Sequence, residues 1–310
     1  MVRSKLTPVE AKLRRSAIRA KVIGQFVIWA VLILMYIPIL VLIAYSFNLN
    51  DQVVAPWVSG AWDNASFDGL YIRLFQSDAG QEIMTALGNT IIIALVSSIL
   101  STVLGTCGAI GVFYSGKKAR AMTEGATQIS VANAEIVVAM SLVVMFVFLG
   151  TYVFGGANLF SFGTLIIGHM VLSLPFVYLS VKPKLQQMDP ALYEAALDLG
   201  CNQPKAMFKV ILPEILPGIL SGFLLSITLS LDDFIVTAFT RGAGLLSGEK
   251  TIETLSTLVQ AKIKKGPVPP EMRALTTFIF LFVLLIVVGI TIYQNVAAKR
   301  HKSHAKGREI

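Results

Sequence analysis

Six long apolar runs dominate this sequence and decide which class of protein it can form. Each is about 20 residues or longer, the length a helix needs to cross a ~30 Å hydrocarbon core at about 1.5 Å per residue. A helix also satisfies its own backbone hydrogen bonds within such a run, so we expect an all-α, polytopic membrane protein. The six expected transmembrane helices are roughly 23–47, 84–114, 129–153, 161–182, 215–240 and 273–297.

Composition agrees with this class. Of 310 residues, 55% are hydrophobic and only 14% charged, and the mean hydropathy is +0.72. A soluble domain of this size could not bury so much apolar surface. The net charge of +8 does not indicate a nucleic-acid partner, because the lysines and arginines form blocks beside the apolar runs. Cys107 lies in an expected span and Cys201 in a polar loop, so no disulfide is expected.

The basic blocks orient the chain, since Lys and Arg favour the cytoplasmic side. They gather before the first run, after the second, around the polar segment behind the fourth, and in the tail, which places both termini and that segment in the cytoplasm. The last outer loop, 241–272, is also basic and is an exception to the pattern. The expected regions are a basic arm, a first helix with its outer loop, a membrane core of five helices that contains the polar loop 183–214, and a basic tail, at 1–22, 23–80, 81–297 and 298–310.

The polar segment 188–213 reads as two short helices. Asp189 can cap the first, with Pro190 at its first position, and Gly200 can end it in a left-handed conformation. A second helix is expected to start at Asn202 and to stop at Pro213. On the first helix one face carries small and apolar side chains, a shallow surface suited to a partner: Leu192, Ala195, Ala196 and Leu199.

Three acids fall inside expected spans. A carboxylate at the centre of a membrane helix costs about 2.5–3.5 kcal/mol, so Asp232 and Asp233 need a cation, a watery cavity or the interface. Neighbouring helical residues point about 100° apart, so at most one of them is expected to face a pathway. The alternative is that the pair marks the outer end of the span. Glu135 has two readings, a gate role or a carboxylate satisfied by Asn133 or a neighbouring helix.

Other motifs give negative expectations. His169 has no metal-ligand spacing around it and is expected to be hydrogen-bonded packing, so no metal is assigned. The run 111–117 has phosphate-loop spacing, but Lys118 follows where Ser or Thr is needed, and a membrane helix precedes it. No catalytic pattern is present and no cofactor is expected in this chain, so any ATP chemistry must come from a partner. Two short helices are expected in outer loops, at GLYIRLF and TIETLSTLVQAKIKKG.

The polar segment resembles a known motif. The run Glu194-Ala195-Ala196, then Gly200, then Ile211-Leu212-Pro213 is similar to the EAA loop of ABC importer permeases, whose helix docks on a cytoplasmic ATPase. Ser230-Leu231-Asp232-Asp233-Phe234 and neighbouring segments over about 25–295 resemble the second permease subunit of bacterial spermidine/putrescine importers. Ala134 departs from the proline expected in that family.

The resemblance implies an inner-membrane complex. Its members would be a second, unlike permease, a homodimeric cytoplasmic ATPase that binds ATP and Mg, and an external polyamine-binding protein. The implied substrate pathway includes Asp232, Asp233 and Glu135, and the implied mechanism is alternating access. The alternatives are a related permease for sulfate, thiamine or ferric ion, a secondary transporter, or a membrane scaffold without transport.

Overall fold

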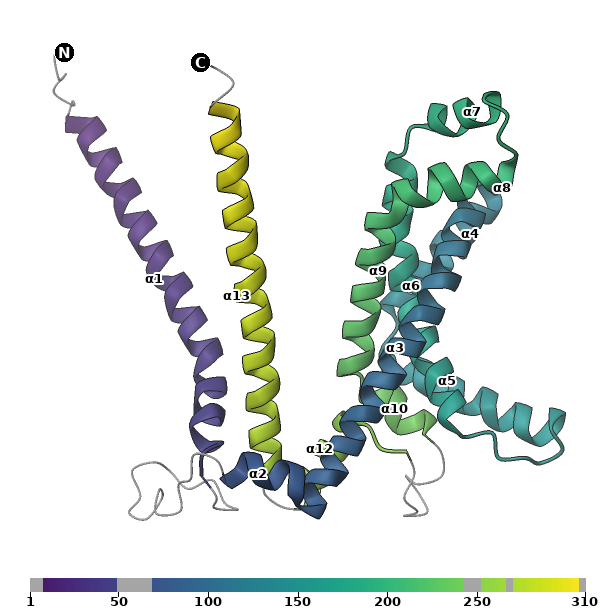
Figure 1. The fold of residues 1–310 in the computed structure, drawn as a ribbon, viewed down its shortest axis with the longest axis horizontal. Coiled ribbons are helices and arrows are strands. Elements are labelled where there is room, and N and C mark those ends of the chain that lie inside the picture. Colours follow the sequence, from purple (N-terminus) through teal and green to yellow (C-terminus); the bar gives the residue numbers. More distant parts are fainter. Residues whose placement is uncertain (1–7, 49–68, 242–251, 266–269, 307–310) are drawn as a thin grey trace. The chain divides into compact units, whose positions relative to one another are not determined.

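The computed structural model describes residues 8–48, 69–241, 252–265 and 270–306, and within these ranges its regular elements are all helices. The chain divides into two compact units, 1–81 with 266–310, and 82–265. Figure 1 shows the elements of both units, which are described separately below. The regions predicted from the sequence follow membrane topology rather than compactness, and they stay a prediction.

The first unit contains α1 (Pro8–Tyr45), α2 (Gly69–Gln76) and α13 (Pro270–Lys306). From Pro8 onward the basic arm and the first expected span form one continuous helix. The predicted short helix GLYIRLF is confirmed as α2. Tyr71 of α2 contacts the end of α1, because its ring centroid lies 5.9 Å from that of Phe47 and its hydroxyl lies 3.1 Å from Ser46 Oγ.

The second unit holds most of α3 and all of the helices from α4 to α12. Their bounds are α3 (Asp78–Phe113), α4 (Lys117–Ala132), α5 (Glu135–Phe148), η1 (Leu149–Val153), α6 (Phe162–Gln187), α7 (Pro190–Asp198), α8 (Gln203–Ala206), η2 (Met207–Ile211), α9 (Leu212–Asp232), α10 (Ile235–Thr240) and α12 (Leu255–Lys265). The long helices α6 and α9 run side by side (Figure 1), and they make the most extensive contact in this unit.

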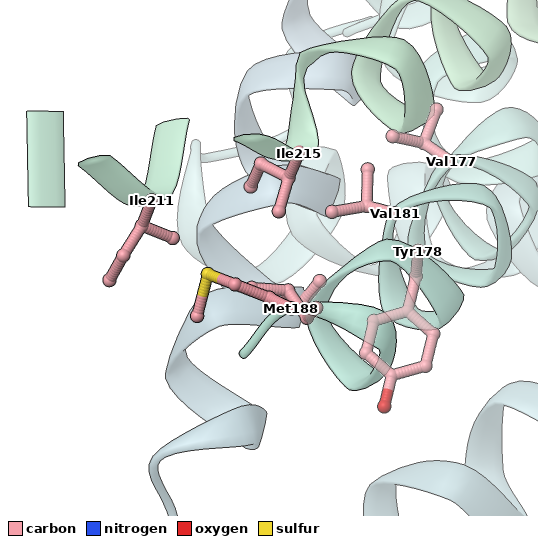
Figure 2. Close-up of a cluster of buried hydrophobic side chains, with 8 residues drawn as sticks. Val177, Tyr178, Val181, Met188, Ile211 and Ile215 are labelled. Carbon is pink, nitrogen blue, oxygen red and sulfur yellow. The ribbon is translucent and has the colours of Figure 1, made fainter. Parts of the chain in front are cut away.

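Glycine allows this close contact. A Cβ built on Gly222 would lie 3.2 Å from Val177 Cα, and one on Gly218 would lie 3.0 Å from the Ser180 carbonyl oxygen. Small residues let membrane helices approach until their backbones touch, which maximises dispersion contacts where lipid removes the hydrophobic driving force. Beside this contact lies a buried cluster, in which Figure 2 shows side chains of α6, η2 and α9 together: Val177, Tyr178, Val181, Met188, Ile211 and Ile215.

Among the residues that the structure describes, five helices are long and apolar enough to cross a membrane: Lys21–Tyr45, Asp78–Phe113, Glu135–Val153, Phe162–Gln187 and Gln203–Asp232. They correspond to the first five expected spans. The sixth, 273–297, falls within α13, which is not among these five, so a count of six stays a prediction.

Two spans differ from their expected form. The third does not start at 129, because Asn133 and Ala134 are both extended and separate α4 from α5. The fifth was expected to run unbroken over 215–240, but α9 ends at Asp232 and α10 starts at Ile235.

The expected stop at Pro213 was also wrong, since α8, η2 and α9 form one continuous helical path. The π-helical turn at Met207–Ile211 ends two residues before this proline. Such a local change of hydrogen-bond register lets a membrane helix carry a residue that has no N–H.

Candidate functional site

A break in a membrane helix forms the centre of the candidate site. The break comprises Asp233 and Phe234, which separate α9 from α10. Asp233 has φ −66° and ψ 127°, an extended conformation that ends α9 after Asp232. Irregular backbone within a membrane span is tolerated only where protein or a watery cavity surrounds it, so the partners of these residues decide what the break can do.

Asp233 is buried, and its carboxylate is fully used inside the protein. It accepts hydrogen bonds from the backbone N–H of Val236 at 3.2 Å, and from the backbone N–H and hydroxyl of Thr237 at 2.9 and 3.1 Å. These bonds satisfy N–H groups that the first turn of α10 would leave unpaired. Asp233 therefore starts α10 and has little capacity left for a ligand.

His169 of α6 extends this network. Its imidazole is 1% exposed, with Nδ1 2.8 Å from Ser230 Oγ, Nε2 2.8 Å from Thr237 Oγ1, and Nε2 3.7 Å from Asp233 Oδ2. The prediction of hydrogen-bonded packing is confirmed. The sequence did not reveal that a carboxylate would be the neighbour, because 63 residues of chain, from Met170 to Asp232, separate the two.

Asp232 differs from its neighbour, because it is exposed on the surface of this unit. It is the last residue of α9, where the final backbone carbonyls have no partner in their own helix. The C-terminus of a helix carries roughly half a negative charge. The side chain and the helix end therefore lie side by side at the surface of this unit, and a pathway role for Asp232 stays a prediction.

Serine hydroxyls join α3 to α9 in the last turns of α9 before the break. Ser101 Oγ lies 2.9 Å from Ser226 Oγ, Ser226 donates to Ser98 Oγ at 3.0 Å, and Ser97 Oγ lies 3.3 Å from Ser230 Oγ. Sequence reasoning missed this set of contacts. The available signal was a four-residue repeat of small residues on α9 at Gly218, Gly222, Ser226 and Ser230, a spacing that places them on one helix face.

The helix predicted in TIETLSTLVQAKIKKG is confirmed as α12, which packs against the break, while its place on the outer side stays a prediction. Ser256 Oγ donates to the Asp233 carbonyl at 2.9 Å. Thr90 of α3 accepts from the Leu255 backbone N–H at 2.8 Å, and Lys262 Nζ lies 2.7 Å from Glu82 Oε2. Through these contacts α12 connects the first half of α3 to the backbone of the break.

Glu135, the third expected acid, starts α5 and is exposed. No hydrogen bond or ion pair within the described ranges joins it to either aspartate or to Asn133. One turn further on, Ala139 packs in a buried cluster with Val236 of α10. The structure thus places Glu135 on a helix that contacts α10, but not at the break.

The polar segment folds into an elbow, defined here as α7 and α8 with the turn between them. Asp189 Oδ1 accepts from the Ala191 backbone N–H at 2.9 Å, and Gly200 has φ +85°, so the predicted cap and left-handed turn are both present. Leu192 and Leu199 are 45% and 86% exposed, whereas Ala196 is buried. The elbow thus presents exposed apolar side chains on a helix that its own chain leaves largely uncovered.

The seven positions that match the EAA loop, four on the elbow and three at the junction of η2 with α9, have different environments. Glu194 and Ala195 are exposed with Gly200 and Pro213, Leu212 is half-buried, and Ala196 and Ile211 are buried. Beside them lies a hollow of about 540 Å³, lined by Tyr114, Tyr193, Gln203, Pro204, Met207 and Ile211. Tyr114 is half exposed, and its partial burial beside Tyr193 raises the pKa of the phenol. The Tyr114 phenol therefore stays neutral at physiological pH.

The elbow and the break lie at opposite ends of α3. Thr90, in the first half of α3, contacts α12, whereas Tyr114 just past its end contacts the elbow. The 24 residue steps from Thr90 to Tyr114 span about 36 Å at helical rise, comparable with a hydrocarbon core. Among the described residues no group of three or more His, Cys, Asp or Glu side chains is placed to hold a metal ion.

Comparisons with known proteins converge on one group. The family model described as "Binding-protein-dependent transport system inner membrane component" matches residues 101–302. The spermidine/putrescine transport system permease protein PotC of Haemophilus influenzae is 32% identical over 264 residues, which cover 85% of this chain and 92% of that protein. PotC of Escherichia coli K12 is 29% identical, covering 82% and 87%. The putrescine transport system permease protein PotI of the same strain is 31% identical, covering 81% and 85%.

Proposed function

Because this chain belongs to the family of binding-protein-dependent transport system inner membrane components, we propose that it is a permease subunit of an ATP-driven polyamine importer. It would form the pathway together with a second, unlike permease. The polyamine substrate is supported by the three relatives described above, two of which are spermidine/putrescine transport system permeases and one a putrescine transport system permease. The importer would lie in the inner membrane with both termini of this chain in the cytoplasm.

The observation that carries the proposal is the end of α9 at Asp232. An exposed carboxylate there adds a full negative charge to the negative end of the helix, within a span. Helix ends of this kind bind cations in transporters whose membrane helices are discontinuous. Asp232 would accept an ammonium group of the substrate, while the fully bonded Asp233 would fix the break that presents it.

The charge of this site bears on the alternative substrates. A sulfate permease would need a positive helix end or cationic side chains, and the C-terminus of α9 offers the opposite sign. Cationic solutes such as thiamine or ferric ion remain alternatives within the family. A polyamine fits further because it carries several separated ammonium groups, and Glu135 supplies a second acid on a neighbouring helix for such a chain.

Coupling to ATP is assigned to the elbow. This chain would bind neither ATP nor Mg, and a homodimeric cytoplasmic ATPase would supply both. The exposed face of α7 and the turn after it would dock on this ATPase through Glu194, Ala195 and Gly200, with the buried Ala196 supporting α7 from inside, while Ile211, Leu212 and Pro213 would anchor the elbow to α9. Closure of the ATPase would push the elbow and switch the spans between inward and outward access. An external binding protein would deliver the polyamine at the α12 end.

Uptake of labelled spermidine by the complete importer, reconstituted in vesicles with its partners, tests the proposal. For Asp232→Asn we expect kcat/KM to fall about tenfold, equivalent to losing ~1.4 kcal/mol of ammonium binding. Asp78→Asn is the matched control, since Asp78 is an exposed acid in the first turn of α3 and should leave uptake unchanged. Uptake that ignores ATP, or wild-type kinetics in Asp232→Asn, would overturn the assignment.

A further inference from the structure

We propose that an aromatic ladder carries the movement of the elbow to α4, and so sets how much transport each ATP yields. The ladder consists of Tyr193, Tyr114 and Phe113 with Arg120 at its far end. The inference deepens the proposed function and rests on it, but it concerns residues outside the EAA-like motif and outside the break.

The ladder connects three helices in sequence. Tyr193 of α7 lies with its ring centroid 5.8 Å from that of Tyr114, just past the end of α3. Tyr114 meets Phe113 edge to face, at 5.2 Å and 90°. The guanidinium of Arg120, on α4, lies 5.5 Å from the Phe113 ring centroid, and its Nη2 donates to the Phe113 carbonyl.

α4 has little else to hold it. None of its residues is buried, and its face towards α6 is polar. Its other charged contact is the ion pair of Glu124 with Lys182 of α6, at 2.7 Å between half-exposed side chains. A partly exposed ion pair contributes roughly 0–1 kcal/mol, so it tethers α4 without fixing its position. The position of α4 therefore depends on the Arg120 end of the ladder.

Rings suit this task. Each has only two side-chain torsions, and edge-to-face pairs favour a defined geometry, contributing about 0.5–1.5 kcal/mol beyond their burial. Tyr193 directly precedes Glu194 on the helix assigned to the ATPase. A displacement of α7 would consequently reach α4 through the ring contacts of the ladder, whose geometry is well defined.

The C-terminal end of α4 connects a displacement of this helix to α5. After Ala132 the chain passes through two extended residues into α5, which begins with Glu135. α5 packs on α10 through Leu142, Phe146 and Val236. Moving α4 would thus tilt α5 about the extended pair and shift Glu135 relative to the break.

The number of spermidine molecules imported per ATP hydrolysed, measured with the complete importer in vesicles, tests the ladder. For Tyr114→Leu and Tyr193→Leu we expect this ratio to fall about fivefold, while ATP hydrolysis persists. The double variant should be no worse than either single one, because the two rings act in series. Tyr114→Phe keeps the ring and should keep the ratio.

Tyr152→Leu is the matched control. Tyr152 also pairs with a phenylalanine, since its ring centroid lies 5.1 Å from that of Phe148, but it lies on η1, away from the elbow. We expect the Tyr152→Leu importer to move as many spermidine molecules per ATP as the wild type. A fall equal to that of Tyr114→Leu would mean that losing any exposed ring pair damages the importer, and would overturn the ladder.

A second measurement separates coupling from folding. Spin labels at Met122 of α4 and Leu224 of α9, which are 76% and 63% exposed, should change distance when the ATPase is trapped in its closed state. We expect Tyr114→Leu to abolish this change without altering the resting distance. An unchanged response would overturn the ladder. If wild-type vesicles imported no spermidine but the distance still responded, the substrate assignment would fail while the ladder stood.

Discussion

At the scale of single residues, the two neighbouring aspartates have opposite environments. The sequence predicted that at most one would face a pathway, because adjacent helical side chains diverge. It could not say which, since that depends on where α9 ends. The carboxylate of Asp233 accepts hydrogen bonds from Val236 and Thr237, three and four residues further on, and lies near His169 of another helix, which no local pattern reveals. Asp232 is the residue left at the surface.

The buried role of Asp233 leads to a first prediction. Asp233→Leu would leave the first N–H groups of α10 without an acceptor, and a buried unsatisfied donor costs about 1–3 kcal/mol. We expect a lower melting temperature in detergent and a lower maximal rate of uptake, with KM for spermidine unchanged. Asp233→Asn should be milder in melting, because Asn caps a helix nearly as well as Asp.

The comparison with Asp232→Asn gives this prediction its control. That variant should raise KM while leaving the melting temperature unchanged, because Asp232 is exposed and makes no hydrogen bond in the described part of the chain. If both variants raised KM equally, the separation of a binding aspartate from a structural one would be wrong.

At the scale of elements, the sequence predicted where helices exist better than where they break. Apolar length identified five spans, and Asp189 and Gly200 marked the ends of α7. The break after Asp232 escaped, because no proline or glycine marks it. Asp233 accepts from the backbone of Thr237 in the next helix, and His169 of α6 lies against Ser230 beside it. The interruption at Asn133 and Ala134 escaped too, since apolar sequence resumes directly behind it.

The packing of α6 on α9 supports a second prediction. Gly222→Val would place a branched side chain where even a Cβ meets the Val177 backbone at 3.2 Å. Overpacking of this kind costs about 1–3 kcal/mol, so the melting temperature should fall by several degrees or the protein should not accumulate. Gly108→Val is the control, because a Cβ there meets nothing within 4 Å. Equal losses in both would indicate a general intolerance of valine in helices.

The attachment of α12 supports a third prediction. Ser256→Ala removes the hydrogen bond to the Asp233 carbonyl, and Lys262→Gln removes the ion pair with Glu82. We expect faster amide hydrogen exchange across 255–265 in the double variant, because two of the contacts on α3 and the break are lost. Thr228→Ala, which loses only a bond within its own helix, should leave that segment unchanged. Unaltered exchange in the double variant would show that α12 is held by other contacts.

At the scale of the whole molecule, the orientation in the membrane is predicted by charge. Cys201 lies in the elbow and is half-buried, whereas Cys107 lies on the surface of a membrane helix. With Cys107 replaced by Ala, a membrane-impermeant maleimide should label Cys201 only from the cytoplasmic side. Labelling from the outer side would place the elbow on the wrong face for an ATPase and would contradict the proposed coupling.

The register between α3 and α9 determines which motions remain open to the transporter. The helices run antiparallel, matching Ser97 to Ser230 and Ser101 to Ser226. A slip of one turn in either direction would keep a single serine match and set the other hydroxyls against Gly105, or against Ile93 and Gly222. The serine contacts therefore favour movement of α3 and α9 together as one rigid pair over sliding of one helix along the other.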